Sequence, residues 1–132
     1  MVVDTSVLVA IFRHEPEEPI FLEAIEDAER TFISTVSIVE TMSVLCSRRG
    51  GATRNHVERL VGRLGLAVEP VDEAQCQAAI DALLAYGKGR HPARLNLGDC
   101  FTYALAKVRG LPLLFKGDDF ARTDIVPAWR PR

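Results

Sequence analysis

Short apolar runs that give way to helical patterns recur along this chain, and this alternation constrains its fold more than any other feature. Apolar residues at helical spacing fill the segments between the runs, and alternating strands and helices predict a mostly parallel sheet covered by helices. We expect a three-layer α/β/α sandwich of four to five short strands, formed as a single domain by residues 1–132. The strand-like runs lie at residues 1–3, 31–34, 66–71, 111–115 and 124–126.

The composition argues against membrane and zinc–thiolate proteins. An apolar fraction of 48% and a charged fraction of 26% are typical of soluble globular domains. No apolar run reaches the roughly 20 residues of a membrane helix, and no export signal is visible, so we expect a cytoplasmic location without membrane association. Cys46, Cys76 and Cys100 form no C-x-x-C pair, and we expect them to be buried thiols rather than zinc ligands.

The net charge of −2 hides a segregation of charge along the chain. Residues 1–40 are rich in acids, whereas residues 41–66 and 86–116 are rich in arginine and lysine. Basic stretches of this kind suit the phosphate backbone of a nucleic acid, although a solvated helix face explains either stretch equally well. The candidate substrate-binding residues are Arg48, Arg49, Arg54, Lys88, Arg90 and Arg94.

Acidic residues stand where the apolar runs meet the helical patterns. Because parallel strands end at the same edge of a sheet, we expect these carboxylates to converge there. Each aspartate alone has a simpler explanation as a helix cap. Glu40 does not, because an ionised carboxylate beside an apolar helix face must be paired or bound to a metal. The acids in question are Asp4, Glu40, Asp99, Asp118 and Asp119.

A cluster of carboxylates requires a balancing cation, and hard oxygen ligands select Mg²⁺ or Mn²⁺. Such an ion suits the hydrolysis of phosphodiesters, because it cancels phosphate charge and orients a water molecule. Two alternatives stay open. A haloacid-dehalogenase-like phosphatase also begins with a strand and an aspartate, but its D-x-D motif would need an acid at Ser6. A non-catalytic module could use the acids as caps and the basic loops to bind RNA or a protein.

Four motifs together resemble the PIN domain in its VapC toxin form: V-V-D-T-S at the start, S-x-x-E, L-N-L-G-D-C-F-x-Y-A-L-A, and K-G-D-D-F near the end. The resemblance covers essentially the whole chain. It implies a Mg²⁺- or Mn²⁺-dependent endoribonuclease of a type II toxin–antitoxin system, which cuts structured RNA and leaves 5′-phosphate and 3′-hydroxyl ends. It also implies inhibition by a cognate VapB-like antitoxin and a homodimeric state.

The resemblance assigns an acidic triad to Asp4, Glu40 and Asp99. Asp118 and Asp119 both remain candidates for a fourth acid, because the spacing around them departs from the family pattern. We expect Asp4 and Asp99 to bind the metal directly, and Glu40 with one of the later aspartates to complete its shell or hold water.

Neighbouring polar residues are candidates for orienting the metal-binding carboxylates. As loop and cap residues they have equally good structural explanations. These residues are Thr5, Ser6, Ser37 and Asn96.

Overall fold

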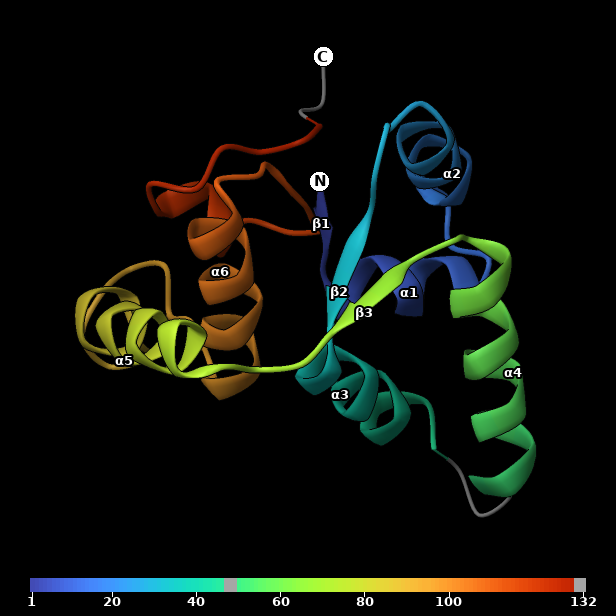
Figure 1. Ribbon diagram of the computed structural model, residues 1–132, viewed down its shortest axis with the longest axis horizontal. Coiled ribbons are helices and arrows are strands. Elements are labelled where there is room, and N and C mark those ends of the chain that lie inside the picture. The colour runs from blue at the N-terminus through green and yellow to red at the C-terminus, as the bar shows by residue number, and fades with distance from the viewer. Residues whose placement is uncertain (47–49, 130–132) are drawn as a thin grey trace.

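The computed structural model describes residues 1–46 and 50–129, which form a four-stranded sheet and six α-helices (Figure 1). The strands lie in the order β3-β2-β1-β4, and all neighbouring pairs are parallel. Their bounds are β1 Val2–Val3, β2 Phe32–Ser34, β3 Ala67–Glu69 and β4 Leu113–Leu114.

The helices form two outer layers, as the expected α/β sandwich requires. Figure 1 shows α5 and α6 on one face of the sheet and α1, α2 and α4 on the other, with α3 beneath the strand ends. There α3 contacts α1, α4 and α6. The bounds are α1 Thr5–Phe12, α2 Glu18–Glu26, α3 Thr35–Leu45, α4 Gly50–Arg63, α5 Glu73–Tyr86 and α6 Leu97–Arg109, with a 3₁₀ turn at Phe120–Arg122.

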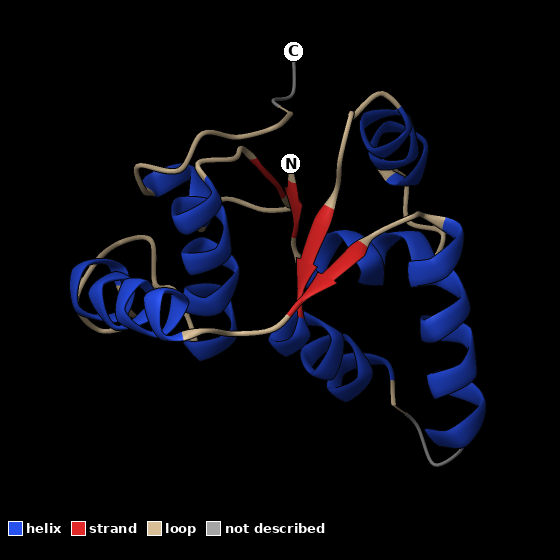
Figure 2. Cartoon of the chain, viewed as in Figure 1, coloured by secondary structure: helices blue, strands red, loops and turns tan. Residues whose placement is uncertain are grey.

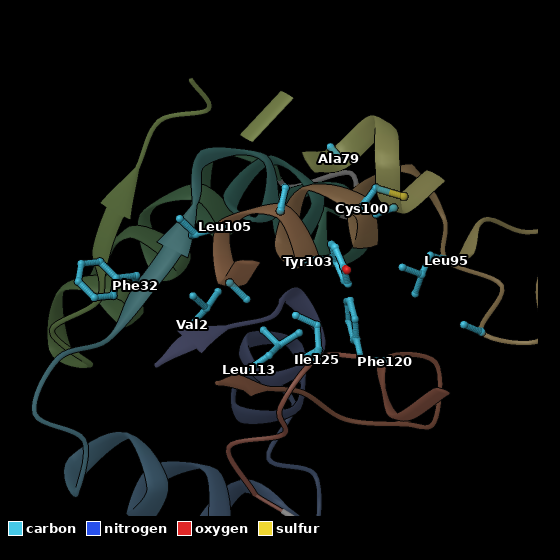
Figure 3. Packing of buried hydrophobic residues seen from close by; sticks show 14 residues of the cluster. Val2, Phe32, Ala79, Leu95, Cys100, Tyr103, Leu105, Leu113, Phe120 and Ile125 are labelled. Carbon is cyan, nitrogen blue, oxygen red and sulfur yellow. The ribbon is translucent and has the colours of Figure 1, made fainter. Parts of the chain in front are cut away.

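The buried core divides into two clusters, one on each face of the sheet. Successive residues of a strand point to opposite faces, so Val2 packs against α5 and α6 while Val3 packs against α1, α2 and α4. Figure 3 shows the first cluster, in which Leu105 and Tyr103 of α6 lie over Val2 and Leu113 of the sheet. Both clusters anchor the strands whose ends carry the candidate site.

The strands are so short that a helix begins almost immediately after β1 and β2 (Figure 2). Asp4 follows β1 and caps α1 by accepting a hydrogen bond from the Ser6 N–H. Ser34 ends β2 and caps α3, where its hydroxyl accepts a hydrogen bond of 3.2 Å from the Val36 N–H. Two helix N-termini and the end of β4 therefore meet at one edge of the sheet.

One expectation about a strand was wrong. Residues 124–126 form no strand of their own; the segment runs beside β4, where the Leu113 N–H donates to Val126 O and the Ala128 N–H donates to Leu113 O. Elsewhere, Gly50 and Gly51 begin α4, since glycine is acceptable at a helix start.

One expectation about exposure also failed. Of the three cysteines only Cys100 is buried, whereas Cys46 and Cys76 are exposed. Within residues 1–46 and 50–129, none of the helices has the length and apolar character needed to cross a membrane.

Candidate active site

Asp4 lies at the centre of the carboxyl edge of the sheet and is only 4% exposed. Its Oδ2 accepts hydrogen bonds from the Ser6 N–H at 3.0 Å and from the Ser6 hydroxyl at 2.6 Å. Its Oδ1 is buried and has no hydrogen-bond partner. Because an unpaired buried carboxylate oxygen is costly, this atom is suited to a cation.

Ser6 connects Asp4 to the end of β4. The Lys116 N–H donates to the Ser6 hydroxyl oxygen at 3.0 Å, and the Asp4 N–H donates to Leu114 O at 3.0 Å. Ser6 thus holds the Asp4 carboxylate from the position where a D-x-D motif would carry its second acid. The neighbouring Thr5 is also buried and donates a long hydrogen bond of 3.4 Å to Ser37 O.

Asp99 occupies the third position of α6 and forms a capping box with Asn96. The Asn96 N–H donates to Asp99 Oδ2 at 2.9 Å, and the Asp99 N–H donates to Asn96 Oδ1 at 2.8 Å. Burial raises the pKa of Asp99 to about 7; the Asn96 hydrogen bond opposes this shift, and the charges of Asp4, Glu40 and Asp119 add to it. These acids are therefore electrostatic neighbours.

Glu40 reaches the same edge from α3. Burial raises its pKa, the Thr5 hydroxyl lowers it, and the charge of Asp4 raises it further. The Glu40 carboxylate lies against Gly98 at the N-terminus of α6, next to Asp99. Glu40 and Asp99 therefore lie near enough to Asp4 for its charge to raise the pKa of each.

Asp118 and Asp119 are both exposed, but they face different surroundings. Asp119 contributes to the raised pKa of Asp99. Asp118 instead lines a hollow together with Phe115 and Trp129. The geometry therefore favours Asp119 as the fourth acid, although both assignments remain predictions.

The four acids offer an all-oxygen donor set of the kind that Mg²⁺ and Mn²⁺ prefer. In the part of the chain that the structure describes, no three His, Cys, Asp or Glu side chains are gathered at metal-binding separations. Ionised carboxylates repel one another, so a cation would draw these side chains closer. A metal site would account for two features, namely the buried Asp4 Oδ1 without a hydrogen-bond partner and the raised pKa of Asp99.

The expected basic residues are dispersed. Arg48 and Arg49 lie outside the described residues. Arg54 is exposed on α4, where its guanidinium forms an ion pair of 2.8 Å with Glu58. This pairing occupies the guanidinium of Arg54, and its contact with substrate stays a prediction.

Lys88, Arg90 and Arg94 are exposed in the loop between α5 and α6. The loop is closed by hydrogen bonds from Lys88 N to Leu95 O and from Leu95 N to Tyr86 O, both 3.0 Å. The loop leads directly into the first turn of α6, so these cations lie close to Asp99 in the sequence. Their role in binding substrate also stays a prediction.

Sequence reasoning named Ser37 but missed its partner Thr102, with which it forms a buried hydroxyl pair between α3 and α6. The hydroxyls of Ser37 and Thr102 are 3.1 Å apart, and the Thr41 hydroxyl donates to Ser37 O at 2.7 Å. Spacing offers a signal, because Ser37 precedes Glu40 by one helical turn and Thr102 follows Asp99 by one turn. A polar residue one turn from a candidate ligand lies on the same face of its helix.

Comparison with known sequences identifies the family. The sequence-family model of the PIN domain matches residues 1–126. Ribonuclease VapC42 of Mycobacterium tuberculosis is 45% identical over 129 residues, which cover 97% of this chain and 98% of that protein. Ribonuclease VapC of Mycolicibacterium smegmatis is 47% identical over 125 residues, or 95% of this chain and 97% of that protein.

Solved structures share the fold at lower identity. The crystal structure of VapC20 from Mycobacterium tuberculosis, a Sarcin-Ricin loop cleaving toxin, matches with a TM-score of 0.76 and 19% identity, covering 98% of each chain. A toxin–antitoxin complex from Klebsiella pneumoniae matches with a TM-score of 0.71 and 22% identity, again over 98% of each chain. The chain therefore belongs to the PIN-domain family, in its VapC branch.

Proposed function

We propose that this protein is the toxin of a type II toxin–antitoxin pair and acts as a Mg²⁺- or Mn²⁺-dependent endoribonuclease. Relatives with about 45% identity over nearly the whole chain carry the name ribonuclease. The sequence motifs and the grouping of Asp4, Glu40 and Asp99 at one edge of the sheet support the same activity.

One observation carries the metal dependence, namely the state of the Asp4 carboxylate. Its Oδ2 is held by two hydrogen bonds from Ser6, whereas Oδ1 is buried without a partner. Among the described residues only one other buried side-chain atom has no partner, the amide oxygen of Gln75. A buried carboxyl oxygen without a partner, beside further acids, is best explained as a cation ligand.

The acidic residues have different roles in the proposed hydrolysis. A bound Mg²⁺ or Mn²⁺ ion would neutralise phosphate charge and favour attack by water. Asp4 and Asp99 would hold the ion, with Asp119 nearby. Glu40, whose pKa is raised by burial, is suited to orient the attacking water and accept its proton. The water oxygen bonds to phosphorus as the P–O3′ bond breaks, and O3′ takes up a proton from solvent, which leaves a 5′-phosphate and a 3′-hydroxyl.

The same proposal extends to partners and location. A structure with the same fold is a toxin–antitoxin complex, which supports a VapB-like antitoxin as the inhibitor of this chain. The homodimeric state comes from the family resemblance, and light scattering of the purified protein tests it. A toxin that cuts structured RNA acts in the cytoplasm, where such RNA is found.

Cleavage of a structured RNA tests the activity directly. We expect the wild-type protein to cut in Mn²⁺ and to stop in EDTA, with 5′-phosphate ends on the downstream fragments. Asp4→Asn and Asp99→Asn should abolish cleavage without changing the circular dichroism spectrum, because asparagine retains the capping oxygen at both positions. Asp81→Asn, an exposed substitution on α5, provides the matched control.

Two outcomes would contradict the proposal. Unchanged cleavage in both Asn variants would remove these acids from the reaction. RNA binding without cleavage in any divalent cation would favour the non-catalytic binding module. Growth arrest on expression, relieved by co-expression of a small protein from an adjacent gene, would test the toxin–antitoxin assignment.

A further inference from the structure

The close approach of Glu40 to Gly98 is a feature that neither the motifs nor the metal ligands explain. Gly98 is the second residue of α6, directly before Asp99. A Cβ atom at this position would overlap the carboxylate of Glu40. Any side chain larger than that of glycine would therefore displace the carboxylate from the first turn of α6.

Backbone conformation does not account for a glycine at position 98. Gly65, Gly89, Gly110 and Gly117 have positive φ angles, which favour glycine, whereas Gly98 lies inside a helix without one. Glycine within a helix is less favourable than alanine. The space beside Glu40 is the remaining reason that the geometry offers.

A second contact between α3 and α6, beside that of Glu40 with Gly98, joins Ser37 and Thr102. Their hydroxyls are 3.1 Å apart, and the two residues are 1% and 0% exposed, so no solvent competes for this hydrogen bond. It joins α3 to α6 one turn away from Glu40 on the first helix and from Asp99 on the second. A buried bond of this kind fixes the separation of two helices.

We infer that Gly98 and Thr102 are positioning residues for the Glu40 carboxylate. The Ser37–Thr102 hydrogen bond holds α3 against α6, and the bare Cα of Gly98 leaves room for the carboxylate beside Asp99. This inference rests on the proposed function, since it concerns how the same acids are prepared for a divalent cation. Neither residue touches substrate.

Gly98→Ala gives the first test, with Mn²⁺ affinity measured by calorimetry and the melting temperature measured in EDTA. We expect the affinity for Mn²⁺ to fall about tenfold or more, as for other residues that orient metal ligands. The melting temperature should stay unchanged or rise, because alanine is the better helix former. If Gly98 had only a structural role, Gly98→Ala would lower both the Mn²⁺ affinity and the melting temperature.

A double-mutant cycle with Glu40 identifies the route of the effect. In the Glu40→Ala background there is no carboxylate to displace, so adding Gly98→Ala should change Mn²⁺ affinity by less than about twofold. A full loss in this background would overturn the inference, because Gly98 would then act without Glu40.

Thr102 is tested by substitutions of matched size. Thr102→Val removes the hydroxyl and should weaken Mn²⁺ binding, whereas Thr102→Ser keeps the hydroxyl and should restore it. Thr31→Val is the control, because Thr31 is also buried but lies at the opposite end of β2 and bonds to Gly65 O. It should lower stability without changing Mn²⁺ affinity.

The wild-type measurement distinguishes failure of the proposed function from failure of the inference about Gly98 and Thr102. If the wild-type protein neither binds Mn²⁺ nor cleaves RNA in its presence, the proposed function fails and the inference fails with it. If the wild type does both, and Gly98→Ala and Thr102→Val bind Mn²⁺ as tightly, the inference alone is overturned. Weaker binding in both variants, with rescue by Thr102→Ser, supports it.

Discussion

Asn96 and Asp99 hold each other through two reciprocal hydrogen bonds at the start of α6. Asn96 donates its N–H to Asp99 Oδ2 at 2.9 Å, and Asp99 donates its N–H to Asn96 Oδ1 at 2.8 Å. One carboxylate oxygen of Asp99 is thereby committed to the helix cap. The other is left for the neighbouring acids and for a cation that would bind among them.

Replacing Asn96 should therefore affect the helix cap more than the site. For Asn96→Ala we expect a loss of about 1 kcal/mol in the free energy of unfolding, which is the typical contribution of a helix cap, because the Asp99 N–H loses the Asn96 side chain as its acceptor. The bond to Asp99 Oδ2 comes from the backbone N–H of residue 96 and is kept, so Mn²⁺ affinity should stay close to that of the wild type. Urea unfolding and calorimetry measure the two effects. Asn96→Ser keeps a capping oxygen and should recover most of the stability; a large loss of Mn²⁺ affinity in Asn96→Ala would contradict the prediction.

The raised pKa of Asp99 predicts a pH dependence of stability in EDTA. Burial raises this pKa from 3.8 in the unfolded chain to about 7 in the folded one. Between these values the folded protein keeps a proton that the unfolded chain has released, so this group makes the folded state less stable as pH rises. Asp99→Asn should remove that part of the slope. Urea unfolding across this range should show a smaller loss of stability in the variant; parallel curves would contradict the prediction.

Ser6→Ala should loosen the connection between Asp4 and the end of β4. The variant loses the 2.6 Å bond to Asp4 Oδ2 and the acceptor for the Lys116 N–H. We expect activity to fall about tenfold to a hundredfold, while the backbone bond from the Ser6 N–H keeps the cap of α1. RNA cleavage and circular dichroism measure the two effects. Ser6→Thr keeps a hydroxyl and is the matched control; an active Ser6→Ala protein would assign Ser6 a purely local role.

The exposed cations of the α5–α6 loop predict a salt-sensitive contribution to RNA binding. Lys88→Gln combined with Arg90→Gln should raise KM with little change in kcat and should make cleavage less sensitive to salt. Arg94 is left unchanged because its φ of 51° would strain many replacements. Arg63→Gln, at the far end of α4, is the control. An unchanged KM in the double variant would remove this loop from the binding surface.

The sequence predicted the sheet and the arrival of acids at one of its edges because both depend on local rules; that these acids form one metal site stays a prediction. Strands followed at once by helices give a parallel sheet, and parallel strands bring Asp4 and the chain after Leu114 to one edge. The cap at Asn96 also follows from residues three positions apart. These features required no knowledge of how the helices pack.

The missed features depend on contacts between elements far apart in the sequence. The Ser37–Thr102 bond and the space at Gly98 exist only once α3 crosses α6. The choice between Asp118 and Asp119 depends on the turn at Gly117, whose φ of 96° redirects the chain just before both aspartates. No periodicity in the sequence contains this information.

Calorimetric titration with Mn²⁺ tests the central claim most directly, because it asks whether the acids at the sheet edge form one cation site. We expect saturable binding to the wild-type protein and its loss in Asp4→Asn, with both proteins equally folded by circular dichroism. The same binding curve in both proteins, or no binding to the wild type, would contradict it.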